Sequence, residues 1–363
     1  EEHNGSMTKI AKLTAPDGGS NTQFGGSVSL SDGIIAVGAK WSDQHGHSNS
    51  GAAYLYQVLP DGTVHYLHKV TAHDANATDY FGSSVSFSHG ILAVGAPSDD
   101  HSGRNDAGSA YVYRLEHNGS LSPLEKLTAS DANASDNFGH SVSTSFDLVA
   151  VGAPSHNHDG ATYLYWQEEN GSFLQIAMLL DPNANYALGG EGDGFGHAVD
   201  IDGDYIAVGA AEKHSSSHAD VGAIYIFKKD AGAETWSQQA KLMASDPGAD
   251  DYLTNWGSLS ISGDTVVAGA NYHDTDVSSA GAAYVWKRSG TTWTEVKKLT
   301  AGNHITTDGR FGISVGISGN TIVVGAGYED VDGVEHAGVL HVYNPQKITN
   351  YYINEIGKYS VDA

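Results

Sequence analysis

The sequence predicts an all-β protein, a six-bladed β-propeller of four-stranded antiparallel blades. Three observations predict this fold: one pattern recurs six times, each copy contains four strand-length runs, and tight turns join those runs. The clearest copy extends from Phe81 to Tyr113. Four antiparallel strands at intervals of roughly 57 residues are typical of a propeller blade, and about four to eight blades is the usual range.

Each copy opens with an aromatic residue followed by glycine. This pair is Phe-Gly in five copies, and the remaining copy has Trp256-Gly257 as a variant. The repeats are therefore predicted to start near residues 24, 81, 138, 195, 256 and 311.

Four runs, here named A to D, follow in each copy. Run A (SVSFS, 84–88) alternates polar and apolar residues, as a half-buried strand does. Run B (ILAVGA, 91–96) is apolar throughout, which favours a strand covered on both faces. Run C (SAYVY, 109–113) places two aromatic rings on one face, and run D (LEKLTA, 124–129) completes the blade. Glycine or aspartate in the A–B turns, as at Asp32-Gly33, predicts hairpins.

The two ends of the chain predict how the last blade is completed. Residues 8–15 (TKIAKLTA) match run D but precede the first repeat, and the last repeat has only runs A to C, within 311–343. We therefore expect residues 8–15 to clasp the last blade as its outer strand, which would remove an exposed sheet edge. The propeller would then occupy residues 1–344, and the tail 345–363 would be an added or donated strand.

Composition excludes several classes of function. The net charge of −25 argues against nucleic acid as a partner, because phosphate binding requires clustered Lys and Arg. No apolar run is long enough for a membrane span, so none is expected. The chain has no cysteine, which excludes disulfides and thiolate metal sites.

The repeat resembles that of a known family. Phe-Gly, then Gly-Ala-Pro at 95–97 and 152–154, then Gly-x-Ala-Tyr-Val-Tyr is similar to the FG-GAP repeat of integrin α-subunit propellers and their bacterial and protist relatives. The resemblance covers roughly residues 8–344 and implies an extracellular or cell-surface location with adhesion or ligand binding. This chain departs from the integrin type in two ways. It has six repeats where integrin-type propellers have seven blades, and it lacks the Asp-rich calcium loop between runs A and B.

The B–C and D–A loops are expected at one end of the blades, here called the top face, and they are the longer loops. Loops on a rigid scaffold usually carry binding residues, and in this chain they are rich in His and Asp. A metal site is one interpretation, but no fixed ligand spacing supports it over a solvated polar rim whose histidines would titrate between about pH 5 and 8. The candidate ligand-binding residues are Asp43, His45, His47, Asp99, Asp100, His101, His156, His158, His214, His218, His273 and Asp274.

The D–A loops repeat the motif DANATD (74–79) and DANASD (131–136). Carboxylates at this spacing are candidate Ca²⁺ ligands, at Asp74, Asp79, Asp131 and Asp136. The alternative, which we favour, is that these side chains accept backbone N–H bonds and fix the turn into run A. No cofactor other than calcium is suggested by these residue patterns.

Five Asn-x-Ser/Thr sequons are candidate glycosylation sites, at Asn4, Asn76, Asn118, Asn133 and Asn170. The alternative is that the Asn-Gly pairs at Asn118 and Asn170 serve as hairpin turns.

The sequence alone favours an extracellular, non-catalytic propeller that binds a protein or glycan through its top-face loops, with no catalytic residue assigned. One alternative is a structural subunit of an extracellular filament or surface assembly, in which identical subunits exchange the C-terminal strand. The other is a secreted carbohydrate-active enzyme, since propellers also host enzymes.

Overall fold

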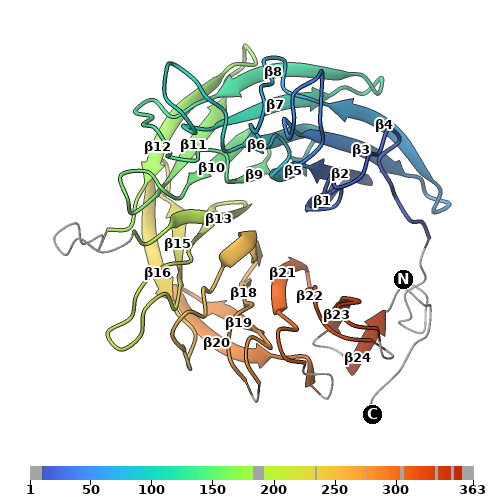
Figure 1. The fold of residues 1–363 in the computed structure, drawn as a ribbon. Helices are drawn as coiled ribbons and strands as arrows, with labels where there is room; N and C mark the ends of the chain where they lie inside the picture. The colour runs from blue at the N-terminus through green and yellow to red at the C-terminus, as the bar shows by residue number, and fades with distance from the viewer. Residues whose placement is uncertain are drawn as a thin grey trace. The chain divides into compact units, whose positions relative to one another are not determined.

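The computed structural model describes residues 10–182, 192–233, 235–275, 277–302, 306–331 and 334–344, and the backbone of 347–353. The predicted six-bladed β-propeller is confirmed: the chain forms six four-stranded antiparallel sheets, each from strands consecutive in sequence (Figure 1). One short 3₁₀-helix, η2 (Asn255–Gly257), is the only helical segment among the described residues. The chain divides into two compact units, residues 1–149 with 166–174, and residues 150–165 with 175–363.

The strands of the first three blades follow the predicted runs. Blade one contains β1 (Ser27–Ser31), β2 (Ile34–Ala39), β3 (Ala52–Val58) and β4 (Val64–Val70). Blade two contains β5 (Ser84–Ser88), β6 (Ile91–Ala96), β7 (Ser109–Leu115) and β8 (Leu121–Leu127). Blade three contains β9 (Ser141–Ser145), β10 (Leu148–Ala153), β11 (Ala161–Gln167) and β12 (Phe173–Leu179).

The last three blades repeat the same order. Blade four contains β13 (Phe195–Asp202), β14 (Tyr205–Ala210), β15 (Ala223–Lys229) and β16 (Trp236–Leu242). Blade five contains β17 (Leu259–Ser262), β18 (Thr265–Ala270), β19 (Ala282–Ser289) and β20 (Thr292–Leu299). Blade six contains β21 (Phe311–Ser318), β22 (Thr321–Ala326), β23 (Val339–Asn344) and β24 (Lys347–Ile353).

Burial follows the hydrophobic pattern of the runs. All six residues of β6 and of β10 are buried, as a continuously apolar run requires. The A–B connections are tight hairpins: Asp32 and Gly33 both have positive φ, at 53° and 73°, which suits a type I′ turn.

Neighbouring blades are joined by a close backbone contact. At four positions the glycine before run C forms a parallel bridge to the phenylalanine that opens the next repeat: Gly51 with Phe81, Gly108 with Phe138, Gly160 with Phe195 and Gly281 with Phe311. A Cβ on Gly108 would lie 2.1 Å from the carbonyl oxygen of Phe138, so only glycine fits there. The phenylalanine ring then packs edge-on against the tyrosine of run C, with 5.3 Å between the ring centroids of Phe81 and Tyr111.

The repeat assignment of Trp256-Gly257 is wrong. Leu253 is fully buried at the position that phenylalanine occupies elsewhere, since a Cβ on Gly222 would lie 2.5 Å from its backbone N and O atoms. Trp256 is 60% exposed and lies in η2. The reason is an insertion: Thr254 and Ser258 make the contacts that Gly82 and Ser84 make in blade two, but two more residues separate them.

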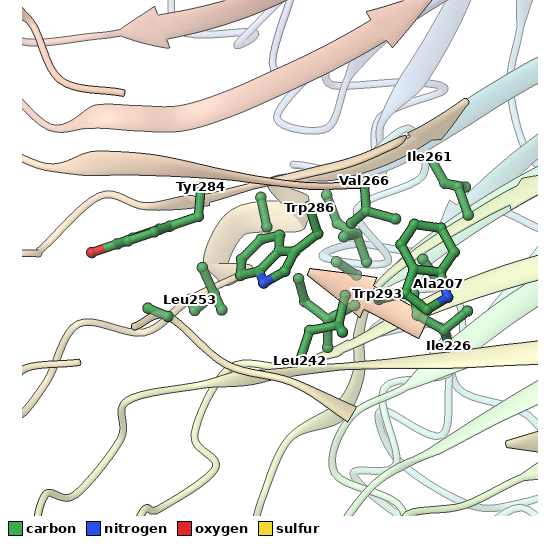
Figure 2. Packing of buried hydrophobic residues seen from close by; sticks show 14 of the residues in the cluster. Ala207, Ile226, Leu242, Leu253, Ile261, Val266, Tyr284, Trp286 and Trp293 are labelled. Atoms are coloured by element: carbon green, nitrogen blue, oxygen red, sulfur yellow. The ribbon is translucent and has the colours of Figure 1, made fainter. Parts of the chain in front are cut away.

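Aromatic side chains fill the seam between blades four and five. Trp286 and Trp293 of blade five pack with Ile226 and Leu242 of blade four and with Leu253 (Figure 2). Leu253 therefore takes over the apolar contact that phenylalanine makes in the other seams.

The structure does not show the predicted closure of the last blade by residues 8–15. The outer position of blade six is taken by β24, which pairs antiparallel with β23. The described residues 10–15 form no strand and contact blade one instead, where the Tyr56 hydroxyl donates to the Thr14 carbonyl at 2.9 Å. Residues 8–15 resemble run D in sequence, but this pattern does not specify which sheet edge a segment pairs with. Closing a short hairpin from β23 to β24 costs less loop-closure entropy than pairing β23 with a segment far away in the sequence.

Replacement of Gly108 by alanine tests the seam contact, with Gly119→Ala as its matched control. Both glycines have φ of 81°, but nothing lies within 4 Å of a Cβ at Gly119. Gly119→Ala is expected to cost only the strain of the left-handed conformation, about 1–2 kcal/mol. Gly108→Ala should cost about 3 kcal/mol or more, because it adds a steric clash.

Urea denaturation of the two variants measures this difference. Equal losses of unfolding free energy in both would show that the close backbone approach does not hold the blades together.

Candidate functional site

A polar network recurs at the top face of the blades. In blades one, two and five, the run-C tyrosine donates its hydroxyl to an aspartate of the preceding loop, and a run-D lysine pairs with the same aspartate. The strand register causes this, because each lysine lies directly across from its tyrosine on the neighbouring strand. The three sets are Tyr54, Asp17 and Lys69; Tyr111, Asp74 and Lys126; and Tyr284, Asp246 and Lys298.

A variable polar residue completes each network. It stands three residues beyond the last alanine of run B and is largely buried beside the run-C side chain. Its identity changes from blade to blade, so each network has different chemistry. In order along the chain, the residues are Ser42, Asp99, His156, Lys213, His273 and Glu329.

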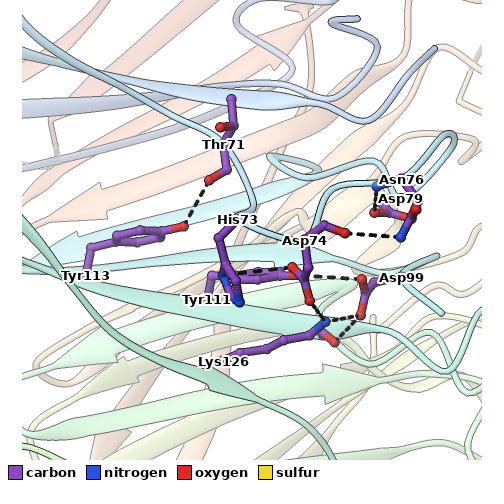
Figure 3. Close-up of polar contacts among 10 residues, drawn as sticks. Thr71, His73, Asp74, Asn76, Asp79, Asp99, Tyr111, Tyr113 and Lys126 are labelled. Atoms are coloured by element: carbon purple, nitrogen blue, oxygen red, sulfur yellow. Dashed lines mark hydrogen bonds and ion pairs between the residues drawn. The ribbon is translucent and has the colours of Figure 1, made fainter. Parts of the chain in front are cut away.

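The blade-two network is rich in carboxylates (Figure 3). Lys126 lies between Asp74 at 2.6 Å and Asp99 at 2.8 Å, and Asp99 also accepts a hydrogen bond from Tyr111. Burial raises the pKa of nearby Asp79 to about 6, and the negative charges of Asp99 and Asp74 add to this, against a hydrogen bond from the Asn76 N–H. Because Lys126 contacts both Asp74 and Asp99, these two carboxylates share its positive charge.

Blade five joins the corresponding groups into one chain from the interior to the surface. The buried carboxylate of Asp251 lies 2.8 Å from His273 Nδ1, and His273 Nε2 lies 2.7 Å from Lys298 Nζ. Lys298 Nζ is also 2.7 Å from Asp246. The side chains of Asp251 and His273 are 4% and 7% exposed, whereas that of Asp246 is 51% exposed. We name these four residues the blade-five site.

The electrostatics of the blade-five site keep its outer end charged. Partial burial opposes ionisation of Asp246, but hydrogen bonds from Lys298 and Tyr284 outweigh it and lower the pKa of Asp246. Asp246 is thus a carboxylate at neutral pH, in contact with water and with a single lysine.

Blade five also departs from the repeat in its backbone and buried polar groups. Thr254 replaces the glycine of Phe-Gly although its φ is 77°, a strained conformation for a β-branched residue. Among the described residues, the Thr254 hydroxyl and both polar side-chain atoms of fully buried Asn271 have no hydrogen-bond partner. Such departures concentrate at functional sites, because elsewhere they cost stability. Together with the hydrogen-bonded chain from Asp251 to Asp246, they favour blade five as the candidate functional site. Buried polar atoms without a partner also occur among the described residues of other blades, at His101 Nε2 and Asp159 Oδ2.

Blade six has a related pair that is closed to solvent. Glu329 and His341 lie 2.8 Å apart, and both side chains are 3% exposed. The burial of both side chains keeps a solute from reaching this pair directly.

Several predicted ligand residues also shape the B–C loops, and their role in binding stays a prediction. Asp43, Asp100 and Asp274 each accept the backbone N–H of a residue five or six positions later at 2.8 Å, and His214 does so at 3.0 Å. These bonds fix the turn. Others remain at the surface of loops or partly covered, and their role in binding stays a prediction; these are His45, His47, His101, His158 and His218.

Of the predicted residues, the networks contain Asp99 and His273, and His156 occupies the same variable position in blade three. Sequence reasoning missed Asp246, Asp251 and Lys298. The recurrent lysine of run D and the aspartate that follows it, as in KLTASD, were the pattern that pointed to them.

The predicted calcium ligands have other partners. Asp79 and Asp136 accept the backbone N–H groups of Asn76 and Asn133, both at 2.6 Å, and Asp74 pairs with Lys126. In the part of the chain that the structure describes, no three His, Asp or Glu side chains gather as a metal site. Calcium binding at Asp74, Asp79, Asp131 and Asp136 stays a prediction.

The sequons are placed in two structural settings. Asn76 and Asn133 are exposed in D–A loops, while Asn118 and Asn170 are exposed in hairpins, where each accepts the N–H of the serine two residues later. Asn4 lies outside the described residues. Glycosylation stays a prediction.

The fold and its repeated top-face networks define an FG-GAP β-propeller. The family model for the FG-GAP repeat matches residues 7–56, 67–113, 122–165, 189–227, 236–286 and 293–343. The chain belongs to this family. No curated protein matches the sequence. No helix in the described residues is long and apolar enough to cross a membrane.

Solved structures with a similar fold include a periplasmic gluconolactonase of Pseudomonas aeruginosa. Its TM-score is 0.56 at 14% identity, over 93% of this chain and 84% of that one. A protein proposed to be a 6-phosphogluconolactonase, from Bacteroides uniformis, has a TM-score of 0.54 at 11% identity, over 90% and 81%. A Bacteroides fragilis protein of the same proposed activity has 0.52 at 12%, over 93% and 82%.

These neighbours overturn the expectation of a non-catalytic protein for adhesion, ligand binding or assembly. Propellers that cover most of this chain carry the names of enzymes. At such identities the likeness shows the fold alone. The physical reason for the error is that the FG-GAP pattern encodes how blades pack, while function depends on the side chains placed upon them.

Replacement of Asp79 by asparagine tests the electrostatics of blade two. The raised pKa of Asp79 means that the folded protein binds more protons than the unfolded chain between pH 4 and 6. Wild-type stability should therefore fall as pH rises from about 4 to 6, by at most about 3 kcal/mol from this group.

Asp79→Asn removes that contribution, so the variant should gain stability relative to wild type as pH rises to 7. Thermal unfolding across this range measures it, and parallel pH profiles of the two proteins would refute the assignment.

Proposed function

We propose that the chain is an exported enzyme that hydrolyses a sugar lactone at the blade-five site. The observation that carries this proposal is the hydrogen-bonded chain from buried Asp251 through His273 and Lys298 to exposed Asp246. The names of the similar propellers support the substrate class. Export is supported by the family and by the periplasmic location named for one neighbour.

Hydrolysis of a lactone requires three catalytic roles from the protein. A base must take a proton from the attacking water, a cation or donor must stabilise the oxyanion that forms on the carbonyl, and an acid must protonate the departing ring oxygen. The product is an open-chain sugar acid.

Two residues of the blade-five site can fill these three roles. Asp246 is exposed and ionised, and accepts the proton of water. Lys298, 28% exposed, donates a hydrogen bond to the lactone oxygen and then a proton to the ring oxygen as the ester C–O bond breaks. Lys298 recovers a proton from Asp246, with which it is in direct contact. His273, which Asp251 orients through Nδ1, contacts Lys298 through Nε2 and positions it.

The equivalent lysines in blades one and two lack this combination. Lys126 is paired with two carboxylates, so little positive charge remains for an oxyanion. Lys69 pairs with Asp17 and with Gln44, a neutral amide that takes up no proton.

The pairing of the top-face lysines favours an unphosphorylated lactone. Lys69, Lys126, Lys213 and Lys298 are already paired with carboxylates. A phosphate dianion generally requires several available cations, whereas a neutral lactone requires none.

The test is hydrolysis of glucono-δ-lactone, followed by pH-stat titration above the spontaneous rate. Asp246→Asn should lower kcat by about 10²-fold or more through loss of the base. Lys298→Gln should lower it by about 10²–10³-fold through loss of the oxyanion donor.

Lys69→Gln is the matched control, since Lys69 holds the same strand position in blade one, and its activity should equal wild type. Wild-type protein that does not accelerate hydrolysis, or an active Lys298→Gln variant, would disprove the proposal.

A further inference from the structure

Arg310, in the loop before β21, lies between two tyrosine rings. Its guanidinium carbon is 4.8 Å from the ring centroid of Tyr272 and 4.9 Å from that of Tyr328. Nη1 of Arg310 donates to the Tyr272 hydroxyl at 3.3 Å. Tyr252 and His336 extend the row by edge-on contacts with Tyr272 and Tyr328, at 5.8 and 5.5 Å. We name Tyr272, Arg310 and Tyr328 the arginine clamp.

The fold does not require the arginine clamp. In blades two and three, the positions of Tyr272 and Arg310 carry Ser98 and Asn137, and the same glycine–phenylalanine bridge forms there. The backbone bond from Tyr328 N–H to the Gly309 carbonyl, 3.3 Å, also has its counterpart between Ser98 and Asp79, 3.4 Å. Small residues therefore suffice for packing, and the clamp is an addition to it.

Arg310 also lacks the partner that a structural arginine in an acidic protein would be expected to have. No described carboxylate pairs with Arg310, and its Nε is buried without a hydrogen-bond partner in the described ranges. The position before it, which is Asp79, Asp136 and Asp193 in other blades, is Gly309 here. Stacking of the guanidinium on the rings restrains its rotation, while the terminal nitrogens Nη1 and Nη2 form the planar end-on fork that fits a carboxylate.

We propose that the arginine clamp binds the carboxylate of a sugar acid. The carboxylate follows from the guanidinium of Arg310, which pairs with no described carboxylate; that it belongs to a sugar rests on the proposed function, whose product is an aldonate. Tyr272 directly precedes His273 of the blade-five site, so β18 leads into both sites. The net negative charge does not prevent binding, because charges farther away than about 8 Å are screened at physiological salt.

Isothermal titration with sodium gluconate tests the clamp, since gluconate is a product and its binding does not depend on turnover. Wild type should bind gluconate saturably, and about tenfold more tightly than neutral glucose. Arg310→Gln should weaken gluconate binding by about tenfold or more, through loss of a charge-assisted bidentate contact. Arg310→Lys keeps the charge but loses the fork, and should also bind weakly.

Arg104→Gln is the matched control, because Arg104 is an exposed arginine of a B–C loop and its loss changes the net charge equally. It should bind gluconate as wild type does. Equal affinity for gluconate and glucose, unchanged affinity in Arg310→Gln, or no saturable gluconate binding by wild type would each overturn the proposal. Gluconate binding through Arg310 in a protein without lactonase activity would refute the proposed function alone.

Discussion

The close contact between a glycine before run C and the backbone of the residue that opens the next repeat is the constraint on which the structure depends. At Gly51, Gly108 and Gly281, a Cβ would lie about 2 Å from a phenylalanine carbonyl oxygen. This approach fixes the spacing of neighbouring blades and brings the phenylalanine ring against the run-C tyrosine. The tyrosine hydroxyl is thereby directed to the top face, where the polar networks form. The repeat thus creates the same polar position in successive blades before any functional residue is specified.

Function then depends on how single blades differ from the common plan. In blade two the variable position is Asp99, which shares Lys126 with Asp74 and makes a closed ion network. In blade five it is His273, which leaves Lys298 with one carboxylate and links it to buried Asp251. The same blade contains Thr254 with a strained backbone and Asn271 with polar side-chain atoms that have no hydrogen-bond partner in the described residues. Both features lower stability, and a blade with a structural role alone would not require them.

Most of the fold was predictable because strand pattern and turn chemistry are local properties. Runs A, B and C gave the strands of every blade, and Asp32-Gly33 gave its hairpin. Trp256 was misassigned because the Trp-Gly pair resembles Phe-Gly in residue type, although the regular interval after Phe195 falls closer to Leu253. The tail 345–363 was predicted to be an added or donated strand, but its place as the outer strand of blade six was not predicted, because edge pairing is not encoded in hydrophobic pattern. Of the blade-five site, the sequence predicted only His273. Its partners Asp251 and Lys298 lie 22 and 25 residues away, and only the folded blade brings them together.

The central claim is that a lactone reacts at blade five rather than at the equivalent networks of other blades. A crystal structure with gluconolactam, an amide analogue that resists hydrolysis, tests it most directly. The lactam carbonyl oxygen should lie within hydrogen-bond distance of Lys298 Nζ, about 2.7–3.2 Å, with the carbonyl carbon facing Asp246. A lactam bound at another blade's network, or crystals that take up no lactam at concentrations that saturate the enzyme, would contradict it.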